Sequence, residues 1–160
     1  MVTLVAGDIL KEQLMVVEKV LVKSNEDIEK GEVCYNDGNG WLAAPNTLCG
    51  TKHGVALVAH DYSAVSYHYI QMLFFGLIVV QKISGTAIKK GQYVTVGATA
   101  GEVTLFVCGD PPTGSSSTYY TTTIEQGILD AMEDNLRYVG VCQQDAGSSD
   151  TVVAVWVGMH

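Results

Sequence analysis

Histidine and cysteine are the residue types in this chain best suited to bind a metal or to act as a catalytic base or nucleophile. The segment holding Cys49, His53, His60 and Asp61 can be compared with a metal cluster, but its spacing matches no structural zinc pattern. We therefore expect polar side chains at loop edges, no metal site and no other cofactor. The 160-residue chain contains four histidines, at His53, His60, His68 and His160.

The four cysteines contain no C-x-x-C pair, and three of them directly follow a valine in apolar stretches. An apolar environment raises the pKa of a thiol and makes it inert. We interpret them as core residues that stay reduced in an intracellular setting. They are Cys34, Cys49, Cys108 and Cys142.

Other catalytic signatures are missing from the sequence. No Gly-x-Ser-x-Gly motif marks a nucleophile elbow, and the glycine-rich stretch 97–101 lacks the Lys-Ser/Thr of a phosphate-binding loop. The acidic residues are scattered, so no pair of carboxylates can be nominated for acid–base chemistry. The sequence predicts a protein that is not an enzyme.

Composition and charge exclude further classes. Only 16% of the residues are charged, against roughly 25% in typical soluble domains, which indicates that much of the surface is buried in an assembly or between sheets. The net charge is −8 and the longest basic cluster is Lys89-Lys90, so we expect no nucleic-acid partner. The most apolar run, 69–80, is too short for a membrane helix, and the first residues lack the features of a signal peptide, so we expect no membrane association.

Valine- and threonine-rich stretches predict a mainly β chain, because branched side chains fit a pleated sheet. We expect strands at 16–23, 53–59, 67–80, 102–107, 138–142 and 151–158, with others after the Lys-Gly turns at 30–31 and 90–91 and from residue 41. Gly76 marks either a bend in one long strand or a break between two. A capping box at Thr122 and an apolar residue every fourth position predict one short helix near residues 123–137 after a loop at 109–118.

An internal repeat organises these elements. Ile28, Lys30 and Gly31 match a second Ile, Lys and Gly 60 residues later, and a Gly-Val-small step occurs at 54–56 and again at 140–142. We predict a single β-rich domain over 1–160, with a candidate N-terminal arm at 1–15, a first β unit at 16–80 and a second β unit, with the helix, at 81–160. The expected turn- and fold-defining glycines are Gly31, Gly91, Gly54 and Gly140.

Tyrosines supply the candidate interface residues. Exposed tyrosine is favoured at protein interfaces, since its ring is apolar and its hydroxyl is polar. Ordinary strand tyrosines would look the same in the sequence. The five candidates, which we expect in or near loops, are Tyr62, Tyr67, Tyr69, Tyr119 and Tyr120.

Three segments carry a family resemblance: 88–94 (Ile-Lys-Lys-Gly-Gln-Tyr-Val), 139–142 (Val-Gly-Val-Cys) and 151–155 (Thr-Val-Val-Ala-Val). Together they resemble the capsid decoration proteins, also called cement or head-stabilising proteins, of phages and archaeal viruses. The resemblance implies a β-barrel or sandwich of the β-tulip kind. It also implies a homo-oligomer, with a trimer favoured, that is made in the host cytoplasm and binds the major capsid protein at the virion surface to stabilise the shell.

Two other classes stay open. Lys-Gly hairpins also recur in lipoyl and biotinyl domains, so the alternative is a non-catalytic small β-barrel binding or carrier module of the barrel-sandwich kind. Against it, no lysine stands at a hairpin tip in the sequence context of a modified lysine. A ligand-binding or enzymatic barrel is the third class, and the sequence shows no polar cluster for it.

Overall fold

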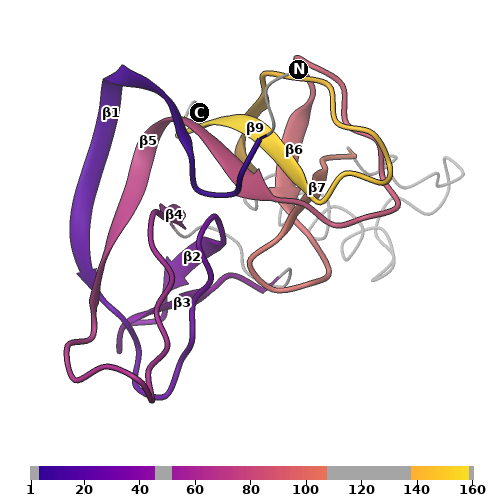
Figure 1. Cartoon of the computed structure of the whole chain (residues 1–160). Coiled ribbons are helices and arrows are strands. Elements are labelled where there is room, and N and C mark those ends of the chain that lie inside the picture. Colours follow the sequence, from indigo (N-terminus) through magenta and orange to yellow (C-terminus); the bar gives the residue numbers. More distant parts are fainter. Residues whose placement is uncertain (1–3, 46–51, 108–137, 159–160) are drawn as a thin grey trace, which may run out of the picture.

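A computed structural model describes residues 4–45, 52–107 and 138–158, which form one curled antiparallel sheet with the shape of a half-barrel (Figure 1). The mainly β prediction is confirmed, and no helix occurs in this part of the chain. In particular, it contains no helix that could span a membrane. The helix expected near 123–137 and the loop expected at 109–118 lie outside the described residues. The strands are β1 (Ile9–Leu21), β2 (Val33–Asn36), β3 (Trp41–Ala43), β4 (Gly54–Ala56), β5 (Tyr69–Gln81), β6 (Tyr93–Val96), β7 (Val103–Leu105), β8 (Tyr138–Cys142) and β9 (Val152–Val157).

Strand β5 is the central element of the sheet. The strand order is β3-β2-β4-β5-β9-β8-β6-β7, and β1 also pairs with β5. The first half of β5 pairs with β4, its second half with β9, and β1 runs antiparallel along much of its length. Among the described strands β1 pairs with β5 alone, and Figure 1 shows it at the outer side of the molecule.

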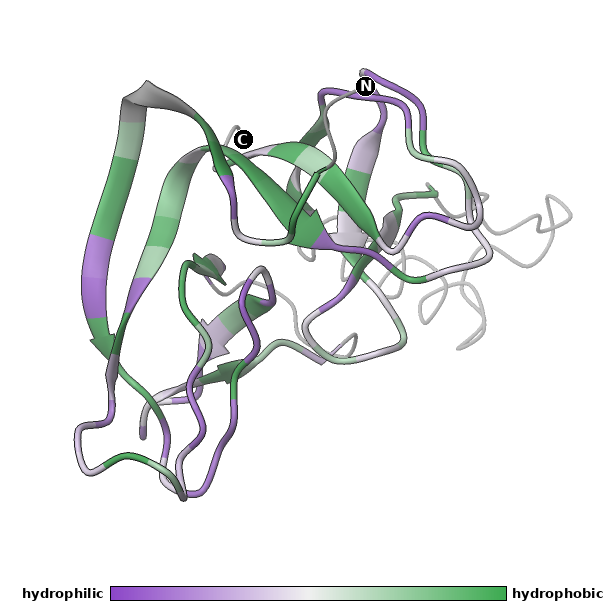
Figure 2. Ribbon diagram, in the orientation of Figure 1, coloured by the Kyte–Doolittle hydropathy of each residue, from purple (hydrophilic) through white to green (hydrophobic). Residues whose placement is uncertain are grey.

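Alternation along β5 gives the molecule two hydrophobic clusters. Leu73 packs into the larger cluster, whereas its neighbours Met72 and Phe74 pack into a smaller one that also holds Cys34. Successive side chains of a strand point to opposite faces, so a strand apolar at every position is buried on both. Figure 2 shows this distribution, with hydrophobic residues concentrated on β5 and β9 and hydrophilic ones in the loops.

Several backbone contacts of the first half recur in the second half. Ile28 N donates to His60 O, and 60 residues later Ile88 N donates to Ala146 O, both at 2.9 Å. The β2–β3 and β6–β7 hairpins follow at the same offset, and each is flanked by a further antiparallel strand, β4 or β8. Strand β5 is the last strand of the first set and the first strand of the second.

Two expected boundaries differ in the structure. β1 begins at Ile9, so residues 9–15 of the candidate arm lie in a strand that pairs with β5 through several register shifts. The stretch expected as one bent strand or two is the single strand β5. Gly76 within it has a φ of +142°, a conformation that other residues rarely adopt, and this lets the strand bend without ending.

Candidate interaction surface

An exposed group of aromatic and apolar side chains lies on β1 and beside it. The rings of Tyr67 and Tyr69 are 56% and 45% exposed, although their centroids are only 5.2 Å apart. Lys19 on β1 places its Nζ 4.5 Å from the centroid of the Tyr67 ring and 5.6 Å from that of Tyr69. A lysine over aromatic rings is attracted by their negative faces. Four further exposed apolar side chains belong to β1: Leu10, Met15, Val16 and Leu21. We call these seven residues the β1 surface.

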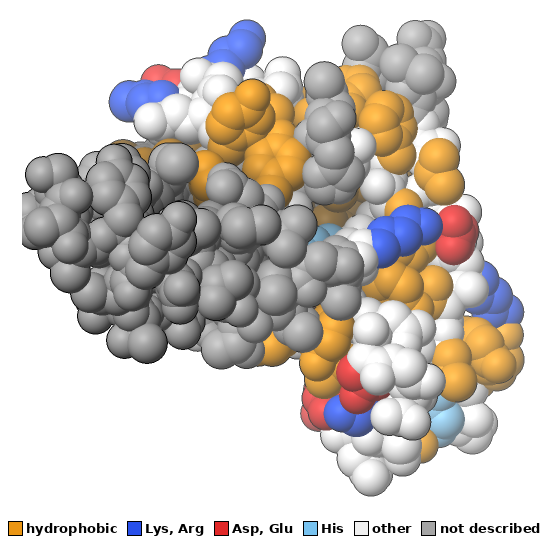
Figure 3. Space-filling view, turned by 180° about the vertical axis from the view of Figure 1, so that it is seen from behind, with side chains coloured by type: hydrophobic (Ala, Val, Ile, Leu, Met, Phe, Trp, Pro, Cys, Tyr) orange, Lys and Arg blue, Asp and Glu red, His pale blue; other side chains and the backbone are white. Residues whose placement is uncertain are grey.

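The β1 surface has the composition of a protein-binding patch. Its tyrosines combine a large apolar area with a polar tip, and both are common at interfaces. Figure 3, which shows the molecule from behind, has hydrophobic side chains at the surface, interrupted by Lys, Arg, Asp and Glu. A soluble chain that leaves such side chains exposed on its outermost strand can gain free energy by covering them with a partner.

Tyr62 belongs to a second, more polar group. The Asp27 carboxylate accepts the Tyr62 backbone N–H at 2.7 Å, and the Tyr62 hydroxyl lies 3.2 Å from Ser24 Oγ. The Tyr62 ring stacks on His68 with centroids 3.9 Å apart and planes at 14°. His68 Nδ1 in turn lies 3.3 Å from His60 Nε2. The structure thus joins two histidines that sequence reasoning placed on separate loop edges.

The loop between His60 and His68 is held by a local turn. Asp61 Oδ1 accepts hydrogen bonds from the Ser63 hydroxyl at 2.7 Å and from the backbone N–H groups of Ser63 and Ala64. These bonds, the Ser63 hydroxyl first, lower the pKa of Asp61 below its ordinary value. His60 is fixed at the other side, since its backbone pairs with Ile28 in both directions. Both histidines therefore sit on well-anchored backbone.

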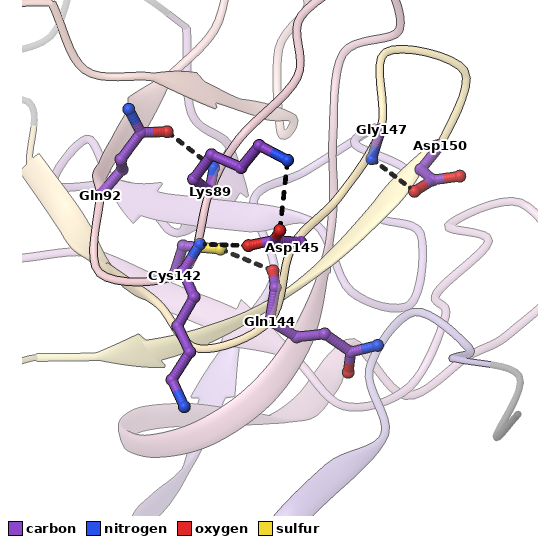
Figure 4. Close-up of polar contacts among 8 residues, drawn as sticks. Lys89, Gln92, Cys142, Gln144, Asp145, Gly147 and Asp150 are labelled. Atoms are coloured by element: carbon purple, nitrogen blue, oxygen red, sulfur yellow. Dashed lines mark hydrogen bonds and ion pairs between the residues drawn. The ribbon is translucent and has the colours of Figure 1, made fainter.

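A cavity of about 360 Å³ opens between Leu4 and the loop and strand residues 144–154. This volume is at the small end of the range for ligand sites. Figure 4 shows that the polar side chains near this loop bond to the backbone and to one another. Asp145 accepts the Lys90 backbone N–H at 2.8 Å and Lys89 Nζ at 3.2 Å, and these contacts lower the pKa of Asp145. The Asp150 carboxylate accepts the N–H of Gly147 at 2.7 Å. These groups brace the loop.

The two described cysteines have the environment of core residues. Cys34 is fully buried, which raises the pKa of its thiol well above the ordinary value, and the Glu32 carboxylate adds to the rise. Burial likewise raises the pKa of the Cys142 thiol, which donates to Gln144 O at 2.8 Å. Both thiols are therefore poor nucleophiles at neutral pH. Cys49 and Cys108 lie outside the described residues.

The predicted site residues fall in several places. Tyr67 and Tyr69 come together on the β1 surface and Tyr62 lies in the histidine group, while Tyr119 and Tyr120 lie outside the described residues. Gly31 and Gly91 have φ values of +83° and +87° at the ends of the two Lys-Gly turns. Gly54 and Gly140 pack against side chains or backbone of the neighbouring strands. Within the described ranges no group of three or more His, Cys, Asp or Glu side chains is arranged to hold a metal ion. The chain matches no protein-family model, no curated protein and no solved structure.

Proposed function

We propose that this chain is a structural virion protein that decorates a capsid shell and stabilises it by binding the lattice of the major capsid protein. The observation that carries this proposal is the β1 surface, whose tyrosines and apolar side chains are exposed on the outermost strand of the described sheet. The low charged fraction of the chain points the same way. The sequence resemblance to decoration proteins supplies the identity of the partner.

The physical role requires no catalysis. A protein that binds only the assembled shell stabilises that shell by mass action, in proportion to its affinity and concentration. The free energy comes from apolar area removed from water on the β1 surface. We further propose that the chain consists of two similar β units that share β5, and that it acts as a homo-oligomer, with a trimer favoured, at the capsid surface. The recurrent backbone contacts support the two units.

The test combines light scattering with co-sedimentation on shells assembled from the major capsid protein of the same genome. We expect a stable oligomer that pellets with the shells. A double variant, Tyr67→Ala with Tyr69→Ala, should lose pelleting while keeping the wild-type circular dichroism spectrum. Tyr93→Ala is the matched control, because Tyr93 is equally exposed, at 54%, but lies on β6.

Two outcomes would contradict the proposal. One is a protein that ignores the shells at micromolar concentrations. The other is a double variant that pellets as well as the wild type, which would move the contact away from the β1 surface.

The alternative function is a non-catalytic small β-barrel binding or carrier module. The cavity beside residues 144–154 favours the binding form of this alternative, since its volume would admit a small polar molecule. Intact-mass spectrometry distinguishes the carrier form, because a lipoyl or biotinyl group on a lysine would add its mass to the chain.

A further inference from the structure

The two histidines His60 and His68 face each other through ring nitrogens, and the distance between these nitrogens is informative. His60 Nε2 and His68 Nδ1 are 3.3 Å apart. That is long for an N–H donor and its acceptor, for which about 2.7–3.2 Å is usual. Two imidazole nitrogens bound to one tetrahedral zinc ion at about 2.0–2.1 Å lie roughly 3.3–3.4 Å from each other. The observed separation therefore equals the span of a two-histidine metal site.

The surrounding side chains hold both rings in this arrangement. Tyr62 stacks on the His68 ring, and the His60 ring meets it edge-on, with centroids 5.4 Å apart and planes at 85°. The Ser24 hydroxyl contacts the phenol of Tyr62 and fixes the stacking ring in turn. His60 is buried and His68 is half-buried, so one side of the pair is accessible from solvent. A preformed pair of this kind requires little rearrangement on binding.

The chemistry of the pair selects a class of ion. Neutral imidazole suits zinc, copper, nickel and cobalt, whereas calcium and magnesium prefer oxygen ligands. The two carboxylates of this loop are engaged elsewhere: Asp27 with the Tyr62 backbone and Asp61 with Ser63 and Ala64. We propose that His60 and His68 form a two-histidine binding site for a divalent transition-metal ion, with water completing the coordination. This site is separate from the β1 surface and does not depend on the proposed function.

The experiment uses the full chain, prepared without a histidine tag and with accessible thiols alkylated. Zn²⁺ is titrated by calorimetry, and Co²⁺ is followed by its visible absorption, which reports coordination by nitrogen. We expect one ion per chain. His68→Phe keeps an aromatic ring against Tyr62 but removes Nδ1, and His60→Ala removes the second ligand. Each should weaken binding by at least about tenfold, since changes even in residues that only support a ligand reach this size.

A matched control removes the other two histidines of the chain, His53 and His160, as His53→Gln with His160→Ala. It should bind like the wild type. Circular dichroism checks each variant, and His68→Phe decides alone if His60→Ala fails to fold. The proposal is overturned if the wild type takes up no ion at millimolar Zn²⁺, or if His68→Phe binds as tightly as the wild type.

Discussion

Lys82 is the one charged side chain that is fully buried among the described residues, with 1% exposure. Its ammonium group donates to Ile83 O at 2.8 Å and to Asp150 O at 3.0 Å. Truncation to alanine removes both hydrogen bonds and leaves a cavity where the side chain packed. We expect Lys82→Ala to lower the free energy of unfolding by about 2–4 kcal/mol, measured by urea denaturation.

Lys82→Met is the control, because it keeps most of the volume and loses only the donors. It should cost less, about 1–3 kcal/mol. Val22, the residue 60 positions earlier, is also buried and makes a comparable backbone bond to the strand that follows it, so an apolar side chain is compatible with this place in the fold. If Lys82→Ala were as stable as the wild type, the two carbonyls would have to be satisfied by water.

Glu32 carries a charge that the fold disfavours. Burial raises its pKa above the ordinary value of 4.5, and the neighbouring charges of Glu29 and Glu102 act in the same direction. A carboxyl whose pKa is raised on folding adds stability below its unfolded pKa, and this contribution is lost as the pH rises through the folded pKa. Glu32→Gln should therefore raise the free energy of unfolding at pH 7, by less than about 1 kcal/mol, with the gain vanishing below pH 4.5.

The second half of the chain supplies the matched position for this experiment. Gln92 Oε1 accepts the Lys89 backbone N–H at 2.6 Å, as Glu32 Oε2 accepts that of Glu29 at 2.8 Å. An amide can thus make the same bond. The reverse change, Gln92→Glu, should alter stability little because residue 92 is exposed. A Glu32→Gln protein less stable than the wild type at pH 7 would contradict the sign argued for Glu32.

Sequence reasoning reached single residues unevenly. The inert cysteines followed from their apolar neighbours, and Cys34 and Cys142 are buried as expected. The contact between His60 and His68 could not be predicted, because the eight-residue spacing matches no ligand pattern. The turn built on Asp61 and the stack on Tyr62 bring the rings together, and both depend on tertiary contacts with Ser24 and Asp27.

At the scale of elements, the alternation and turn signals located the strands well. The return strand at 41–43 and the strand at 138–142 have the predicted limits. The start of β1 was missed because residues before 16 fit a helical period as well as a strand. Their pairing with β5, which local sequence does not encode, decides for the strand. In the same way, propensity could not show that β5 would pair with β1, β4 and β9.

The glycines at 54 and 140 occupy the same place in two neighbouring strands, but their surroundings differ. A Cβ at Gly140 would collide with the carbonyl oxygen of Trp156 in β9, a backbone atom that cannot move without breaking the β8–β9 pairing. A Cβ at Gly54 would lie 2.8 Å from the ring edge of Phe74, a side chain that can rotate. We expect Gly54→Ala to cost about 1–3 kcal/mol and Gly140→Ala to cost more.

Urea unfolding followed by circular dichroism measures both glycine variants under the same conditions. Equal losses of stability would show that β9 can shift away from β8 as easily as the Phe74 ring can turn. A neutral Gly140→Ala would place the backbone of β9 farther from β8 than the structure has it.

For the whole molecule, the shared strand β5 predicts cooperative unfolding. The residues before it and the residues after it both build their sheets on β5, and the larger hydrophobic cluster draws side chains from both halves. Neither half can then open without exposing core of the other. We expect one unfolding transition for the entire described sheet.

Cys34 in β2 and Cys142 in β8 are built-in probes of this cooperativity, since each is buried in a different half. Both thiols should resist a short pulse of iodoacetamide in the native protein, because burial raises the pKa of each. Across a urea series, peptide mass spectrometry should give the same labelling midpoint for both, coincident with the loss of circular dichroism. If Cys142 were labelled at a clearly lower urea concentration than Cys34, the second half would unfold by itself. β5 would then have to retain β1 and β4 after losing β9, and the chain would behave as two domains that share a strand.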